Sequence, residues 1–199
     1  MFKRQNPIDN KKKWKFDSYI GRNTSWWHYY FQYKEVIDEM VTNIENNTPI
    51  DKVSLPLMFL IRHSLELGLK ANILKLEPVN NGVEKIKLSG SNSHSLEFLF
   101  DRFTLHLETV KKNYKISNEI RTQMDIYLND FSALKDKLHK LDKGSFNFRY
   151  PVDTKGDYNF TWDTRENLSE IINLYYSIQP FLVFTDSVLY EEGVFGFEE

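Results

Sequence analysis

Four ionisable side chains are expected to share one side of the most apolar stretch of the chain, which spans residues 54–76. Arg62, Glu66 and Lys70 are four residues apart, so on a helix they form one row. His63 precedes Glu66 by three residues and lies on the neighbouring row. Because an unpaired buried charge is costly, these groups must pair with one another, reach water or contact a ligand.

Two interpretations of this row stay open. In the first, Arg62, Glu66 and Lys70 form an internal salt-bridge ladder that orients their helix within the protein. In the second, the row lines a polar pocket in which Arg62 and Lys70 bind an anion. His63 or Glu66 then transfers a proton as a general acid or base.

His94 and Arg149 could complete such a pocket. His94 stands at the start of a predicted helix, and Arg149 lies between Phe148 and Tyr150. On a strand, the two aromatic residues share one face and Arg149 takes the other. Arg149 then points outward or along the rim of the pocket to hold an anion, and His94 becomes another candidate for proton transfer. In the structural alternative, Arg149 stacks on an aromatic ring or pairs with Asp142.

Arg22 and His28 form a further arginine–histidine pair, with five residues between them. This spacing fits Arg-x(4–6)-His, a ribonuclease signature in one helical superfamily. The simpler alternative is that the aromatic run over residues 26–31 forms a core and interface face. No P-loop, dinucleotide-binding, zincin or α/β-hydrolase motif is present. The five histidines are scattered, so we expect no metal site and no cofactor.

Length and charge set the limits for any function. The 199 residues predict one domain, expected over residues 17–190, and the absence of cysteine excludes disulfides and cysteine catalysis. Residues 1–16 form a basic N-terminal tail and residues 191–199 an acidic C-terminal tail. The net charge of -2 gives no general sign of a nucleic-acid binder, although it does not exclude a local anion site.

Helical periodicity dominates the elements that must position these residues. Residues 91–143 contain neither glycine nor proline, and apolar residues recur there every three or four positions. Helices are expected from residue 24 or 25 to 45 and over residues 54–76, 96–112, 117–141 and 163–190. Residues 83–88 suggest a short strand, and alternating aromatic and polar residues near 145–162 predict a small β-hairpin. The predicted fold class is therefore all-α, an antiparallel five-helix bundle with an inserted hairpin.

Location and assembly follow from the apolar and aromatic content. The longest apolar run, residues 55–61, is far shorter than the ~20 residues that a membrane-spanning helix needs. No apolar signal segment opens the chain, so we expect a cytoplasmic protein without membrane contact. The 15% aromatic content favours a homodimer, because aromatic residues are enriched in interface cores. The candidate partner-surface residues are Trp26, Trp27, Tyr29, Tyr175 and Tyr176.

The segment Pro56–Lys70, with the sequence PLMFLIRHSLELGLK, resembles the second helix of a group of bacterial HEPN-like proteins. His94-Ser95-Leu96 and Phe148-Arg149-Tyr150-Pro151, followed by Gly156, fit the same group. The resemblance spans about residues 22–185. It implies an antiparallel helical bundle that dimerises. Many such proteins are metal-independent ribonucleases of toxin, CRISPR and phage-defence systems, in which Arg and His from both subunits meet, while others are catalytically silent binding partners.

One departure from that group leaves two functional hypotheses open. The nuclease motif of the group lies near the start of a late helix, but no histidine follows Phe160 here. The first hypothesis is an RNA-binding or RNA-cleaving dimer of a defence or toxin system, in which His63 or His94 acts as base and Arg62 and Arg149 hold the phosphate. Its partners would be RNA and a cognate antitoxin or other defence-system protein. The second is a non-catalytic helical dimer that binds a small anion or docks onto a partner protein.

Overall fold

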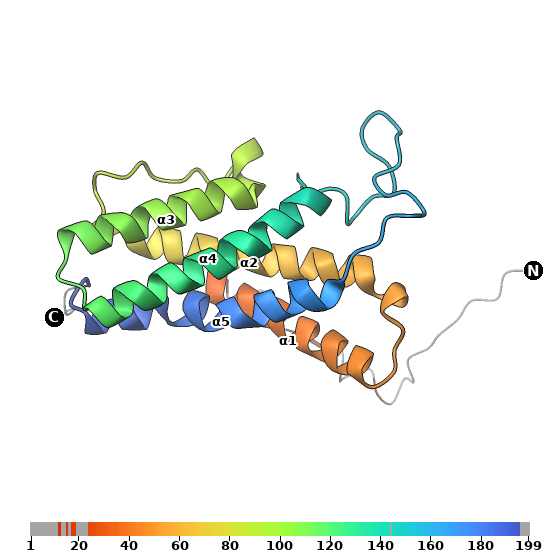
Figure 1. The fold of residues 1–199 in the computed structure, drawn as a ribbon, viewed down its shortest axis with the longest axis horizontal. Helices are drawn as coiled ribbons and strands as arrows, with labels where there is room; N and C mark the ends of the chain where they lie inside the picture. The colour runs from red at the N-terminus through yellow and green to blue at the C-terminus, as the bar shows by residue number, and fades with distance from the viewer. Residues whose placement is uncertain (1–11, 13–14, 16, 19–23, 144, 196–199) are drawn as a thin grey trace, which may run out of the picture.

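The computed structural model describes residues 12, 15, 17–18, 24–143 and 145–195. These residues form five long helices, α1 (Trp26–Glu45), α2 (Ser54–Leu76), α3 (Leu96–Asn113), α4 (Asn118–Leu141) and α5 (Leu168–Glu191) (Figure 1). Three short 3-10 helices, η2 (Ile50–Lys52), η3 (Glu77–Val79) and η4 (Ser91–His94), lie in the connections. The described residues contain no strand, so the prediction of a mainly helical fold is confirmed. None of the helices among them is long and apolar enough to cross a membrane.

Side-chain caps set most of the helix starts. The hydroxyl oxygens of Ser25 and Ser117 accept hydrogen bonds from the first turns of α1 and α4, as predicted. The expected start of α5 at Asp163 is wrong, because the Asp163 carboxylate accepts a hydrogen bond from the Thr161 hydroxyl at 2.5 Å within a separate turn. Asn167 caps the helix instead, accepting from the Ser169 amide at 3.1 Å.

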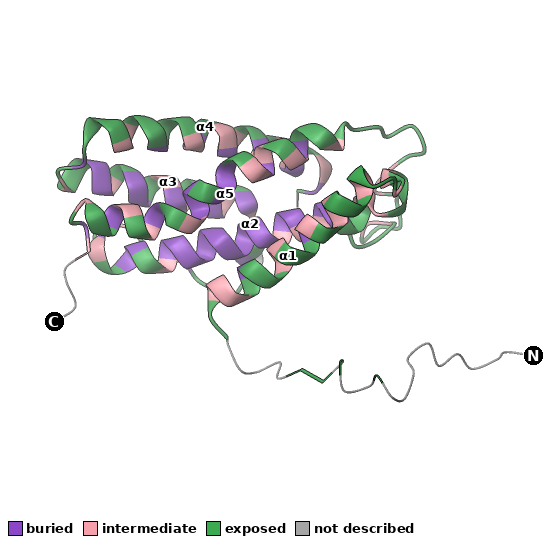
Figure 2. Cartoon of the chain, turned by 90° about the horizontal axis from the view of Figure 1, so that it is seen from below, coloured by how far each residue is buried: buried purple, intermediate pink, exposed green. Residues whose placement is uncertain are grey.

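Helix α2 is the centre of the bundle and packs against α1, α3 and α5. It is buried along almost its whole length, as the purple ribbon in Figure 2 shows. Gly68 permits this close packing, because a Cβ placed there would lie 3.3 Å from side-chain atoms of Tyr30 and Leu182. The core position of the most apolar helix is therefore as the hydrophobic pattern predicts.

The helix directions differ from the expected antiparallel arrangement. Helices α1 and α2 are antiparallel, as are α4 and α5 (Figure 1). Helices α2 and α3, however, run in the same direction, because the connection over residues 77–95 returns along the bundle before α3 begins (Figure 1). Two contacts fix this parallel register: the early α2 residue Arg62 binds His94, and Asn80, just beyond α2, binds His106 in the later part of α3.

The two predicted strand regions are irregular. Residues 83–88 form no strand. In place of a hairpin, the segment over residues 145–167, called here the α4–α5 loop, contains one isolated bridge between Val152 and Tyr158. Residues 191–195 belong to the bundle rather than to a separate tail. The Glu192 carboxylate accepts hydrogen bonds from the amide and hydroxyl of Ser117 at 2.7 and 2.8 Å, and Val194 is buried.

Candidate functional site

The predicted row on α2 is buried and internally paired. Arg62, Glu66 and Lys70 are 1, 2 and 4% exposed. The Lys70 ammonium donates to Glu66 Oε1 at 2.7 Å, and Arg62 Nη1 lies 3.5 Å from Glu66 Oε2. The ammonium group also lies 5.6 Å from the centroid of the Trp26 ring. This geometry favours the salt-bridge ladder, because neither cation is open to an anion from solution.

Asp142 joins this row from the end of α4. Its Oδ2 atom lies 3.7 Å from Arg62 Nε, while its Oδ1 atom accepts from the Phe146 and Asn147 amides at 2.7 and 3.1 Å. Arg62, Glu66, Lys70 and Asp142 are called here the buried charged cluster. The alternative pairing of Asp142 with Arg149 is thus wrong, because the cation nearest to this carboxylate is Arg62.

Arg62 connects two segments that are distant in sequence. Its Nη2 atom donates to the backbone carbonyl of His94 at 2.7 Å, while its Nε atom faces Asp142, which ends α4 and binds the Phe146 and Asn147 amides of the α4–α5 loop. Burial lowers the pKa of Arg62, and the carboxylates of Asp142 and Glu66 oppose that shift. The guanidinium group therefore holds η4 and the loop against the same part of α2.

His94 is the exposed partner of the cluster. Its side chain is 61% exposed, and its Nδ1 atom lies 2.8 Å from Glu66 Oε1. Burial raises the pKa of Glu66, but the hydrogen bond and charge of Lys70, followed by those of His94, outweigh it and lower the pKa overall. An ionised carboxylate can only accept hydrogen bonds, so Nδ1 carries the proton. In the neutral imidazole, Nε2 is then the proton acceptor.

His63 is half-buried and surrounded by rings. It stacks on Phe59 with centroids 5.7 Å apart and meets the edge of Tyr33 at 4.7 Å. Burial lowers the pKa of His63, opposed by the charge of Glu66. The contacts of His63 with Phe59 and Tyr33 favour a packing role over proton transfer.

Arg149 is exposed and lies against aromatic rings. Its guanidinium carbon is 5.8 Å from the Phe59 centroid and 5.5 Å from the Tyr150 centroid, and Nε donates to the Ser145 carbonyl at 2.7 Å. The predicted strand alternation is wrong here, because residues 146–149 form a turn. Phe148 is consequently buried, whereas Tyr150 is exposed. Phe59 contacts both Arg149 and His63, and its role as the link between them could not be inferred from spacing.

The sequence-predicted residues thus separate into three groups. Arg62, Glu66 and Lys70 meet inside the protein, and His94 contacts Glu66 from the solvent side. His63 and Arg149 lie against the Phe59 ring instead. His28 lies in the first turn of α1, with its ring beside Tyr29, while Arg22 is outside the described residues. Within the described part of the chain, no group of three or more His, Asp or Glu side chains could hold a metal ion.

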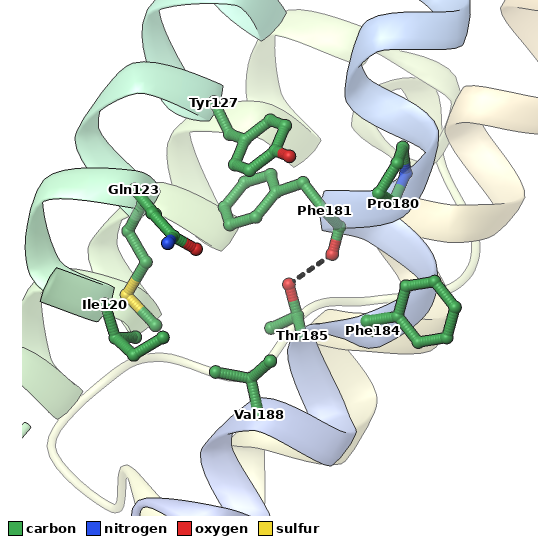
Figure 3. A pocket seen from close by; sticks show the side chains of 9 residues that line it. Ile120, Gln123, Tyr127, Pro180, Phe181, Phe184, Thr185 and Val188 are labelled. Carbon is green, nitrogen blue, oxygen red and sulfur yellow. Dashed lines mark hydrogen bonds between the residues drawn. The ribbon is translucent and has the colours of Figure 1, made fainter.

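An apolar groove lies elsewhere, between the first half of α4 and the second half of α5 (Figure 3). Its volume is ≈ 180 Å³, and Met124, Tyr127, Phe181 and Phe184 are among its lining residues. None of the predicted site residues borders it. The groove is therefore separate from the candidate chemistry at the other end of α4.

Comparisons with known proteins found no matching family model, no matching curated protein and no matching solved structure.

Proposed function

We propose that this chain is a HEPN-like protein of bacterial defence or toxin type that acts as a dimer, binds RNA at His94 and Arg149 and cleaves it without a metal ion. The observation that carries the proposal is the 2.8 Å contact between the exposed His94 ring and the buried Glu66 carboxylate. A carboxylate that fixes one ring nitrogen leaves the other oriented for proton transfer, which is the arrangement that general base catalysis requires.

The proposed reaction uses the 2′-hydroxyl of RNA as the nucleophile. His94 Nε2 takes the hydroxyl proton as the 2′-oxygen forms a bond to the adjacent phosphorus. The bond from phosphorus to the 5′-oxygen breaks, and that oxygen takes a proton from the imidazolium or from water. Arg149 would stabilise the negative charge that develops on the phosphate oxygens. Arg62 and Glu66 act as positioning residues, because both are buried behind His94.

RNA cleavage at low salt in the presence of EDTA tests this proposal, because phosphate contacts are strongest at low salt. We expect the wild-type protein to cut RNA and His94→Ala to lose most of the activity while still binding. His139→Ala is the matched control, because this α4 histidine also has a carboxylate near its ring: His139 Nε2 lies 4.0 Å from Oε2 of Glu97 on α3. Equal activity in the His94 and His139 variants would contradict the role of His94.

Binding is tested separately with Arg149→Ala. We expect this variant to bind RNA more weakly, with a smaller dependence on salt, because one cation fewer contacts phosphate. Arg102→Ala is the control, since Arg102 also lies over a phenylalanine ring, 5.2 Å from the Phe98 centroid, but on α3. Sedimentation at micromolar concentration tests the dimer, and a monomer would contradict it.

A second candidate function is a non-catalytic helical dimer that binds a small anion or docks onto a partner protein. Two observations favour it: Arg62 and Glu66 face each other inside the protein, and the sequence of α5 contains no histidine. This candidate expects His94→Ala to leave any biological effect intact. A wild-type protein that neither binds nor cuts RNA at low salt would exclude the first function and leave this one.

A further inference from the structure

The connection over residues 77–95 contains an exposed asparagine–glycine pair, Asn81-Gly82. At no other place in the 199 residues does a glycine follow an asparagine. The pair lies in a turn that the Val83 amide closes by donating to the Asn80 carbonyl at 2.9 Å. In Figure 1 this connection runs along the outside of the bundle before α3 begins, so the turn is open to water.

An asparagine in this position can react with its own backbone. The Gly82 nitrogen attacks the side-chain carbonyl carbon of Asn81 and loses its proton to solvent. The bond from that carbon to the side-chain nitrogen breaks, this nitrogen takes a proton and leaves as ammonia, and a five-membered succinimide remains. Water then adds to one of the two ring carbonyl carbons and opens the ring. The product is aspartate or isoaspartate, in which the main chain passes through the former side chain.

The structure leaves the attacking nitrogen unhindered. A Cβ placed on Gly82 would meet no atom of the surrounding protein within 4 Å. Within the described part of the chain, no acceptor binds the Gly82 amide. Because glycine has no Cβ, its backbone also reaches the conformations that ring closure requires at little cost. Both the nitrogen and the carbonyl carbon that it attacks are therefore accessible.

The pair Asn92-Ser93, in η4 of the same connection, is held in the opposite way. The Ser93 amide donates to the Gly90 carbonyl at 3.2 Å, and Ser93 is 2% exposed. Its nitrogen is thus engaged and covered, although Asn92 itself is exposed. The fold therefore favours reaction at Asn81 over reaction at this second asparagine.

Asn80, the neighbour of the reactive residue, anchors the turn to α3. It is 1% exposed, and its side-chain amide donates to the His106 carbonyl at 3.1 Å. The same nitrogen lies 3.1 Å from His106 Nδ1. A buried and engaged amide is a poor centre for ring closure. Any change at Asn81 therefore acts directly beside a contact that holds the connection in place.

Isoaspartate at position 81 should disturb this part of the connection. It adds one methylene group to the main chain before Gly82 and places a new carboxylate on the turn. The bond from the Val83 amide to the Asn80 carbonyl spans the lengthened link. The bond from the Ile86 amide to Glu77 Oε1, at 2.7 Å, spans it as well. Both bonds must therefore rearrange when the main chain lengthens.

We propose that Asn81 is a site of spontaneous deamidation and that its isoaspartyl product loosens the contacts of residues 80–86. The reaction needs no enzyme and no partner, since Gly82 supplies the nucleophile and water supplies the oxygen. It is faster in alkaline solution, because the attacking nitrogen must lose its proton. It is independent of the proposed RNA function.

Incubation of the purified protein in mildly alkaline buffer, followed over weeks by tryptic digestion and mass spectrometry, tests the proposal. The tryptic peptide 76–85 contains Asn80 and Asn81, and the peptide 88–102 contains Asn92. Fragmentation locates the mass increase that accompanies replacement of NH₂ by OH, and a zero-time sample corrects for reaction during digestion. We expect deamidation at Asn81, with aspartyl and isoaspartyl forms, while Asn80 and Asn92 stay intact.

Gly82→Ala is the matched variant. The open space at position 82 and a φ outside the left-handed region allow an alanine there, so the variant should fold. Its Cβ should slow deamidation of Asn81 by about tenfold or more, because the added group hinders ring closure. Equal rates in the two proteins, or faster reaction at Asn92 than at Asn81, would overturn the site.

Hydrogen exchange tests the consequence of the modification. In the isoaspartyl protein, separated by ion exchange, the amides of Val83 and Ile86 should exchange faster than in fresh protein. Asn81→Asp carries the new charge on an unchanged main chain and should exchange as the fresh protein does. Unchanged exchange at Val83 and Ile86 in the isoaspartyl protein would overturn the loosening.

Discussion

The buried charged cluster and the α4–α5 loop meet at Asp142, yet the cluster buries charged side chains whereas the loop exposes aromatic ones. Asp142, at the end of α4, is 1% exposed, whereas Trp162, in the loop that follows, is 98% exposed. Each charge in the cluster faces an opposite charge or a backbone amide. Tyr158 and Trp162 in the loop, in contrast, are 78 and 98% exposed.

The difference separates residues that hold the site from residues that can meet a ligand. A buried ion pair contributes little net stability, but removal of one partner is costly because the other charge stays buried. An exposed ring that packs on nothing can be removed at little cost to the fold. The two regions should therefore respond in opposite ways to substitution: stability should depend on the cluster and binding on the loop.

The largest effect is expected for Arg62→Met. This change leaves the Asp142 and Glu66 carboxylates buried without their shared cation, so the free energy of unfolding should fall by about 3–5 kcal/mol. Urea denaturation followed by circular dichroism measures it. Arg102→Met is the control, because Arg102 pairs at 2.7 Å with a Glu84 side chain that is 74% exposed. An exposed pair of this kind contributes about 1 kcal/mol or less.

Comparable losses in the two variants would show that burial adds nothing to the importance of Arg62. A larger loss in Arg62→Met should also affect both segments that the guanidinium holds. Amide exchange should then accelerate together at residues 94 and 146–147. Faster exchange in only one of these segments would contradict the role of Arg62 as their common support.

Most of the helical framework could be predicted from the sequence, because periodicity and capping residues act locally. Ser25 and Ser117 cap their helices through hydroxyl groups that lie three residues from the amides they bind. The shared direction of α2 and α3 could not be predicted, because an apolar stripe does not record which way its helix runs. The predicted start of α5 at Asp163 is wrong because the Asp163 carboxylate accepts a hydrogen bond from the Thr161 hydroxyl, a competing local contact.

The geometry of the site could be predicted from residue spacing where one helix supplies it. The row of Arg62, Glu66 and Lys70 follows from a spacing of four residues. The contact between Asp142 and Arg62 joins two helices, so no spacing within either helix reveals it. Tyr175 is a second case in which spacing is not enough. The sequence suggests it for a partner surface, but its side chain is completely buried. Its hydroxyl accepts a hydrogen bond from the Ser64 hydroxyl on α2 at 3.0 Å.

A smaller effect is expected from pH. Burial lowers the pKa of both His63 and His106. The unfolded chain therefore binds more protons than the folded protein as the pH falls below about 6.5, the ordinary value for histidine. Stability should decrease through this range and level off below the folded-state values. The charged or titratable groups that act on His63 are Glu66, Lys70, Arg62 and His94.

Urea midpoints between neutral and mildly acidic pH measure this dependence. His63→Phe should reduce the slope, because a phenyl ring can keep the stacking on Phe59 without titrating. His139→Phe, at a half-buried histidine on α4, serves as the control. A slope that is unchanged in His63→Phe would mean that the aromatic surroundings do not suppress protonation of this histidine.

The smallest effect on stability is expected in the loop. Combined replacement of Tyr158 and Trp162 by alanine should change the free energy of unfolding by no more than about 0.5 kcal/mol, because exposed side chains that pack on nothing contribute little. Phe148→Ala, in contrast, should lower it measurably, since this ring is only 6% exposed. A double variant as unstable as Phe148→Ala would mean that these two rings are packing residues. A double variant that stays folded but no longer binds RNA would show that one set of loop residues anchors the loop and another binds the ligand. The cluster and the loop would then divide stability and binding in the same way.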